Sequence, residues 1–418
     1  MTATPTRTRF DNNRLIVRCC YLGMFIQALV INLTPLLFIP LKDQLGLTYE
    51  QVGRLVLINF LTQMVVDLIC SGLVDRINVK PLTVAANLLA GAGLWIFALA
   101  PTYAPTPYVG LALGTIVFSI GCGLLEVLLS PIINAVPSER KAADMAVLHA
   151  FYPIGKVTVI IVTALALHQI GAEHWRAIML AWSIFPFVNT LGFLLVRLPP
   201  FAHASTRQTL RELVRKPTFL MLLLALGLAG ATELTIAQWA SAFAEKGLGV
   251  PKLVGDLLGF CLFGVGMIIG RLWFGVRGEQ MNLRRIMIGS TLLAAAMYLV
   301  TSLAPSPWLA LAACAAAGLF VAMLWPGTLS LATAAFPLAG GSMFALLAAA
   351  GDTGAALMPW GLGLVADQVA AHPIPLAALF GAGLSPDQLG LRAGLLVAML
   401  CPLAMALVLW RLREASAQ

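Results

Sequence analysis

The sequence predicts an all-α membrane protein in which twelve transmembrane helices form two pseudo-symmetric six-helix bundles. Of the 418 residues, 60% are hydrophobic and only 11% are charged, whereas a soluble domain carries about a quarter charged residues. A bilayer crossing takes ~20 apolar residues, so this hydrophobic content suffices for about twelve crossings. Uninterrupted apolar runs such as residues 82–100 and 309–323 exclude an outer-membrane barrel, whose strands are short and alternate.

The apolar segments, taken in order, lie between charged or Pro/Gly-rich breaks. They predict spans at 19–41, 51–74, 82–100, 108–136, 144–170, 176–196, 218–244, 253–275, 284–304, 308–335, 342–370 and 391–411. The longest cytoplasmic connection, 198–217, opens with two prolines and continues as a basic stretch, as expected of an interdomain linker. The predicted organisation is therefore a tail at 1–18, a bundle at 19–197, the linker, a bundle at 218–413 and a tail at 414–418.

The basic residues predict the orientation in the membrane. Lys and Arg gather in the N-terminal tail, the linker and the connections on the same side, while the opposite connections hold only Lys42, Arg176, Lys246, Lys252 and Arg392. By the positive-inside rule, both termini are cytoplasmic. We expect a monomeric multi-pass protein of a cell membrane, the bacterial inner membrane, surrounded by the lipid bilayer.

Several other classes of protein do not fit the sequence. The net charge of +8 is spread over short connections and forms no basic domain, so nucleic acid is not an expected partner. The seven cysteines lie in or beside apolar segments and indicate neither a disulfide framework nor a metal site. Neither H-E-x-x-H nor G-x-S-x-G occurs, so we expect no enzymatic activity. We also expect no cofactor, and the expected coupling ion is a proton.

The two halves echo each other in sequence. Gly123-Leu124, Leu129 and Pro131 in the fourth span have the spacing G-L-x-x-x-x-L-x-P, and Gly318-Leu319, Leu324 and Pro326 repeat it in the tenth. Duplicated six-span halves are the plan of transporters that rock around a site near the middle of the membrane.

The candidate proton site is Glu126, in the middle of the fourth span. A charge in hydrocarbon costs at least ~2.5–3.5 kcal/mol, so an ionisable residue there indicates a function. Its counterpart in the second half is Val321, which shows that the repeat does not require an acid at this position. Burial favours the neutral form of a carboxyl group, so Glu126 is expected to bind and release a proton; a buried acid satisfied by a neighbouring span is the alternative.

The fifth span adds three candidates on one helix face: His149, Tyr152 and Lys156. Lys156 is expected to meet Glu126 across neighbouring helices, so that protonation of the acid would release the lysine. A static ion pair and an anionic substrate on Lys156 are the alternatives. His149 is either a proton relay or an interfacial residue, and Tyr152 is expected to contact the solute.

Polar side chains in other spans predict the solute contacts. Glu233, Gln238 and Trp239 combine an acid, an amide and an indole, which suit hydroxyl groups and an apolar sugar face. They could equally be interhelical contacts and an interface anchor. Gln27 and Asn32 of the first span and Asp352 of the eleventh complete the expected set, whereas Asp67, near the cytoplasmic mouth, is expected to serve a gate or to form a structural ion pair.

The loop after the second span resembles the signature loop of the major facilitator superfamily, G-x-L-x-D-R-x-G-R-K. Asp75, Arg76 and Lys80 match this pattern, while Ser71 and Asn78 replace its two glycines, and Gly270-Arg271 begins a degenerate copy after the eighth span. The resemblance implies the major facilitator fold and a gating role for Asp75, Arg76, Lys80 and Arg271.

The fourth and fifth spans resemble the fucose permease branch of sugar and proton symporters. The fourth span contains its G-x-L-E-x-x-x-x-P element, ending at Pro131, and 148–155 is similar to its aromatic-Gly segment. The branch's first-span aspartate has no counterpart, because that span offers only Gln27 and Asn32. The resemblance implies proton-coupled transport of a sugar or sugar-like solute, with Glu126 in proton coupling. A proton-coupled exporter or importer of a small organic anion or drug-like compound is the alternative.

Overall fold

The computed structural model describes residues 6–73, 78–138, 141–199, 210–277, 282–337, 339–372, 380 and 383–412. Over these ranges the secondary structure is helical and includes no strand. Eleven helical segments within them are long and apolar enough to cross a membrane. The remaining predicted span, 342–370, corresponds to α16 (Gly340–Ala371), a 32-residue helix that packs against α3 and α10. The predicted fold class is therefore confirmed.

The helices of the first half mostly follow the predicted spans closely, but α1 begins at Thr6, inside the predicted tail 1–18. They are α1 (Thr6–Leu36) with α2 (Phe38–Leu45), α3 (Tyr49–Leu73), α4 (Val79–Leu99) with η1 (Ala100–Thr102), α5 (Pro107–Ala135), α6 (Lys141–Ile170), η2 (Ala172–His174), α7 (Trp175–Trp182) and α8 (Ile184–Leu195).

The second half begins after a short helix in the linker, α9 (Leu210–Leu213). It contains α10 (Pro217–Ala242) with η3 (Phe243–Gly247), α11 (Lys252–Val254), η4 (Gly255–Cys261), α12 (Leu262–Arg277), α13 (Leu283–Leu303), α14 (Pro307–Val321), α15 (Leu324–Ala335), α16, α18 (Pro386–Ala398) and α19 (Leu400–Arg411). The segments η3 and η4 are π-helical.

Prolines explain why several predicted spans are each split into two helices. Proline lacks the backbone N–H that would bond to the carbonyl one turn earlier. The breaks between α7 and α8, α14 and α15, and α18 and α19 each lie about one turn before a proline: Pro186, Pro326 and Pro402. The break before Pro326 matters for the site, because Trp325 lies in the first turn of α15, just after it.

Glycines allow α10 and α16 to approach closely. A Cβ atom on Gly354 would lie 1.7 Å from the carbonyl oxygen of Gly227, and one on Gly230 would lie 2.1 Å from that of Gly351. Two pairs of glycines therefore face each other, a packing pattern typical of membrane helices. This contact fixes the position of α16, which carries Asp352.

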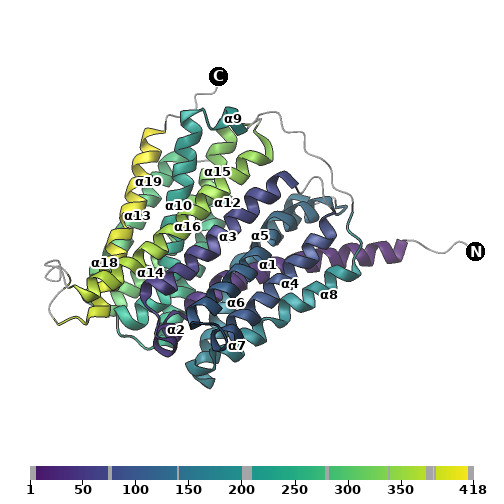
Figure 1. Ribbon diagram of the computed structural model, residues 1–418. Coiled ribbons are helices and arrows are strands. Elements are labelled where there is room, and N and C mark those ends of the chain that lie inside the picture. The colour runs from purple at the N-terminus through teal and green to yellow at the C-terminus, as the bar shows by residue number, and fades with distance from the viewer. Residues whose placement is uncertain are drawn as a thin grey trace, which may run out of the picture.

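The two halves converge at one end of the molecule. Figure 1 shows them close together around α2 and α14 and spreading apart toward α9 and the two chain termini. We call the end with the termini and α9 the linker side, and the end with α2, η1, η2 and η3 the distal side. Asp75 and Arg76 of the signature loop lie outside the described residues, whereas Lys80 donates a hydrogen bond to the carbonyl of Leu194 within the first half (2.8 Å).

Candidate functional site

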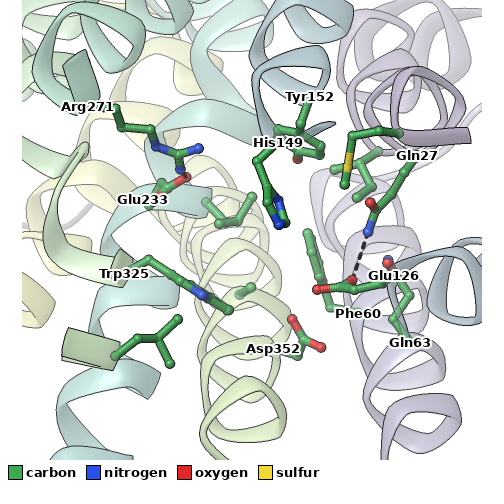
Figure 2. Close-up of a pocket in the computed structure, with 15 residues that line it drawn as sticks. Gln27, Phe60, Gln63, Glu126, His149, Tyr152, Glu233, Arg271, Trp325 and Asp352 are labelled. Atoms are coloured by element: carbon green, nitrogen blue, oxygen red, sulfur yellow. Dashed lines mark hydrogen bonds and ion pairs between the residues drawn. The ribbon is translucent and has the colours of Figure 1, made fainter. Parts of the chain in front are cut away.

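A polar cavity lies between the two halves, with a volume of about 320 Å³. This volume falls in the usual range for small-molecule sites. Residues from both halves form its wall: Met24, Gln27, Ile31, Phe60, Gln63, Glu126, His149, Tyr152, Glu233, Leu234, Arg271, Trp325, Leu329, Asp352 and Ala355. Seven of the side chains that the sequence singled out thus lie around one space, Gln27, Glu126, His149, Tyr152, Glu233, Arg271 and Asp352 (Figure 2).

Glu126 reaches the cavity from α5. Its side chain is exposed there, although Leu125 and Leu128 near it on α5 are buried. The amide Nε2 of Gln27, on α1, donates a hydrogen bond of 2.8 Å to its Oε2 (Figure 2). Among the described residues, no Lys, Arg or His side chain forms an ion pair with it. The carboxyl group is therefore open to the cavity and stabilised by a neutral donor.

Lys156 does not meet Glu126, so the predicted pair is not formed in this structure. The lysine is 5% exposed and does not line the cavity. Its Nζ lies 4.9 Å and 5.3 Å from the ring centroids of Phe263 and Phe260, and 3.8 Å from Met267 Sδ. The reason is its depth along α6: Lys156 is one turn beyond Tyr152 and reaches the packed contact with the second half instead of the cavity.

The other candidates of α6 do reach the cavity. His149 is exposed to it, and its Nε2 lies 3.4 Å from the hydroxyl of Ser130 on α5. Tyr152 lies one turn further along the same face (Figure 2). Both side chains can hydrogen-bond to a solute in this space.

Glu233 and Arg271 form a pair across the wall of the second half. The Arg271 Nη2 lies 3.7 Å from Glu233 Oε1, and both residues line the cavity (Figure 2). The expected gate residue Arg271 therefore reaches the cavity wall. The pair is loose: Arg271 Nε and Glu233 Oε2 are buried and have no hydrogen-bond partner among the described residues.

Two further acids lie near Glu126. Asp352 is 6% exposed and lines the cavity, and its Oδ2 has no hydrogen-bond partner in the described part of the chain. Asp67 is 4% exposed and also has an unpartnered oxygen, but it does not line the cavity. It lies close enough to interact electrostatically with Glu126 and Asp352. Asp67 is therefore a buried neighbour of the site.

Asn32, Gln238 and Trp239 were expected to contact the solute, but they are buried outside the cavity. Asn32 bonds to the carbonyl of Ala28 (2.8 Å) and Gln238 to that of Ile31 (3.5 Å). The indole of Trp239 bonds to the carbonyl of Pro359 (2.9 Å) and is 0% exposed. These three side chains stabilise the packing of α1, α10 and α16.

The residues of the wall that the sequence did not single out include one polar and two aromatic side chains: Gln63, Phe60 and Trp325. Phe60 and Gln63 share a face of α3 with Asp67 at helical spacing, and this spacing was a usable signal. Trp325 lies between Leu324 and Pro326 of the repeated motif, where the helix break turns its ring into the cavity (Figure 2).

Contacts between the halves concentrate on the distal side of the cavity. The carboxylate of Asp367, on α16, accepts hydrogen bonds from the backbone N–H groups of Tyr49 (3.1 Å) and Glu50 (2.7 Å), where α3 begins. The Glu50 side chain in turn accepts bonds from Arg54 and from Trp360 of α16. Two peripheral ion pairs also join the halves: Lys246–Asp43 (2.8 Å) and Lys42–Asp387 (3.9 Å). We call these contacts the distal closure.

Comparison with known proteins identifies a family. The family model described as Major Facilitator Superfamily matches residues 20–359. Comparison with curated protein sequences gives no match.

Solved structures give further likenesses. A bacterial homolog of the human lysosomal transporter Spinster, in an inward-facing and occupied conformation, has a TM-score of 0.77 and 15% identity, over 98% of this chain and 97% of that one. The nucleoside transporter NupG has a TM-score of 0.76 and 12% identity, over 96% and 100%. The E. coli fucose:proton symporter FucP has a TM-score of 0.63 and 14% identity, over 98% and 100%. At these identities the likeness concerns the fold.

Proposed function

This chain belongs to the major facilitator superfamily and is a transporter rather than an enzyme, and from that premise we propose that it is a secondary active transporter for a small polar solute, a sugar or sugar-like compound. We propose that transport proceeds by alternating access and is coupled to protons. The protein would act as a monomer in a cell membrane, the bacterial inner membrane, with both termini in the cytoplasm and no cofactor besides the proton.

The observation that supports proton coupling is the position of Glu126. Its carboxyl group faces the cavity, accepts one hydrogen bond from Gln27 and forms no ion pair among the described residues. Sealing an ionised carboxylate away from water is costly, whereas sealing a protonated one costs much less. A proton on Glu126 would therefore allow the two halves to close around the cavity, and its release would favour opening.

The composition of the wall supports a polar, hydroxyl-rich solute. Gln27 and Gln63 offer amides, Tyr152 offers a phenol, and the acids offer acceptors. Trp325 and Phe60 provide aromatic surface for the apolar face of a sugar ring. Both sides of the cavity contribute, so a bound solute would contact both halves, as alternating access requires.

The position of the distal closure supports an assignment of state. If the linker side is cytoplasmic, as the distribution of basic residues indicates, the structure is closed toward the outside. Tyr49, Glu50 and Asp367 would then have to separate for the cavity to open outward. The residues expected to gate the opposite side include Asp67, Asp75, Arg76 and Lys80.

One observation favours a second candidate, a small organic anion. Arg271 lines the cavity, its Nε is unpartnered among the described residues, and its contact with Glu233 is 3.7 Å. A carboxylate or phosphate group on the solute would satisfy the guanidinium better than this loose pair does.

The experiment that tests the proposal begins with a thermal-shift screen of the purified protein against sugars, sugar acids and organic anions. A solute at 100 times its dissociation constant should stabilise the fold by about 2.7 kcal/mol. A stabilising compound is then added to proteoliposomes that contain a pH-sensitive dye. A change of internal pH that accompanies uptake of the solute, and that a protonophore abolishes, supports coupling. Solute flux without proton movement contradicts it.

A further inference from the structure

The side chain of Asp352 is oriented for a partner that the described residues do not supply. It extends from α16 into the cavity and is 6% exposed, and its Oδ2 has no hydrogen-bond partner in the part of the chain that the structure describes. Figure 2 shows Asp352 and Glu126 directed into the same space from opposite halves. Leaving a buried carboxylate oxygen unpaired is costly, so a ligand group that pairs with Asp352 would gain from this arrangement.

The surroundings of Asp352 favour a positively charged partner. Glu126 faces the same space, and Asp67 lies behind the wall and interacts electrostatically with both acids. Arg271, a basic residue of the wall, forms a loose ion pair with Glu233, and His149 lines the cavity from α6. Among the described residues, no Lys, Arg or His side chain forms an ion pair with Asp352.

Aromatic rings occupy the remaining wall beside this acid. Trp325 and Phe60 both line the cavity, and Figure 2 shows the indole of Trp325 pointing into the space beside Asp352. An ammonium group is attracted to the face of an aromatic ring and donates strong hydrogen bonds to a carboxylate. Acids and rings together form the pattern that recognises a protonated amine, whereas a neutral hydroxyl would gain less from a carboxylate and an aromatic face.

We propose that the solute carries a protonated amine, as an amino sugar does, and that Asp352 binds this ammonium group. This inference rests on the proposed function and narrows its substrate class. The two acids of the cavity then have different roles. Glu126, which already accepts a hydrogen bond from Gln27, exchanges the proton. Asp352, whose Oδ2 has no hydrogen-bond partner among the described residues, binds the charged group of the solute.

The test compares three probes that differ at one position of the ring: D-glucosamine, D-glucose and N-acetyl-D-glucosamine. Their dissociation constants are measured on the purified full-length protein by calorimetry, below the pH at which the amine of glucosamine loses its proton and at matched ionic strength. A hydrogen bond to a charged group contributes about 1.5–3 kcal/mol, so glucosamine should bind at least about tenfold more tightly than either neutral sugar.

Two variants test whether the side chain of Asp352 causes the preference for glucosamine. Asp352→Asn should lose the preference for glucosamine, whereas Asp352→Glu, which keeps the charge, should retain it; both are checked for a monodisperse, folded protein. Glucose binding as tightly as glucosamine overturns this inference and leaves the proposed function in place. A preference that survives in Asp352→Asn, or the absence of binding by all three probes, also overturns it.

Discussion

The distal closure depends most on Asp367, whose carboxylate caps the start of α3 from the other half of the molecule. Its two oxygens accept hydrogen bonds from the backbone N–H groups of Tyr49 and Glu50. Replacing Asp367 by Asn removes the charge and leaves a single acceptor oxygen. When the halves separate, water satisfies the same N–H groups, so the substitution destabilises the closed state relative to the open one. Loss of a cap of this kind costs about 0.5–2 kcal/mol, and a change of one to two kcal/mol alters a population ratio about 5- to 30-fold.

The assay measures the separation of the halves on the distal side. Spin labels are placed at Tyr103 and Pro305, exposed residues in the connections that follow α4 and α13, in a chain whose native cysteines are replaced. Pulsed electron spin resonance then gives the distribution of distances. Asp367→Asn should move a substantial fraction of molecules to the longer distance.

Asp43→Asn is the matched control. It removes the ion pair with Lys246, in which the Asp43 side chain is 47% exposed, and exposed pairs contribute only about 0–1 kcal/mol. The control should therefore shift the distribution much less. Equal shifts in the two variants, or no shift in Asp367→Asn, would refute the argument that the cap holds this side closed.

Two further predictions concern packing. Lys156→Met keeps most of the length of the side chain among Phe260, Phe263 and Met267 but removes a buried charge that forms no ion pair among the described residues. The melting temperature should be unchanged or higher and coupled transport should persist. Uncoupled transport would show that the lysine takes part in proton coupling. Gly354→Ala forces a Cβ atom against the carbonyl of Gly227 and should lower the melting temperature by the equivalent of about 1–3 kcal/mol. The control is Gly289→Ala, whose added Cβ meets no atom within 4 Å and which should be neutral or stabilising. Similar effects of the two substitutions would argue against close packing of α10 on α16.

The spans were predictable because their signal is local. About twenty consecutive apolar residues form a membrane helix in almost any tertiary context, and the predicted 108–136 and 284–304 correspond to α5 (Pro107–Ala135) and α13 (Leu283–Leu303). The splitting of spans at Pro186, Pro326 and Pro402 was visible in the sequence as well, but its effect on Trp325 depends on how the two helices are oriented after the break.

The cavity was only partly predictable, because polarity within a span does not specify the direction of a side chain. Glu233 lines the cavity and Gln238 does not. The two are five residues apart, and at 3.6 residues per turn they lie on different faces of α10. The same spacing separates Gln27, which lines the cavity, from Asn32, which does not.

Lys156 shows the complementary limit. It shares a face of α6 with His149 and Tyr152. The prediction that it meets Glu126 took this face into account but not the position of Lys156 along the helix axis. One turn beyond Tyr152 the halves are packed together, and the lysine contacts aromatic rings there. Distances between helices of different halves are set by tertiary packing, which one sequence does not reveal.

The central claim is that protons drive transport through Glu126, and Glu126→Gln tests it most directly. Wild-type protein and the variant are reconstituted in proteoliposomes, and two quantities are measured for the solute found by the thermal-shift screen: accumulation driven by an imposed pH gradient, and exchange of labelled for unlabelled solute without a gradient. The wild-type protein should do both, and the variant should retain exchange but lose accumulation. A variant that still accumulates solute in response to the pH gradient would contradict the account.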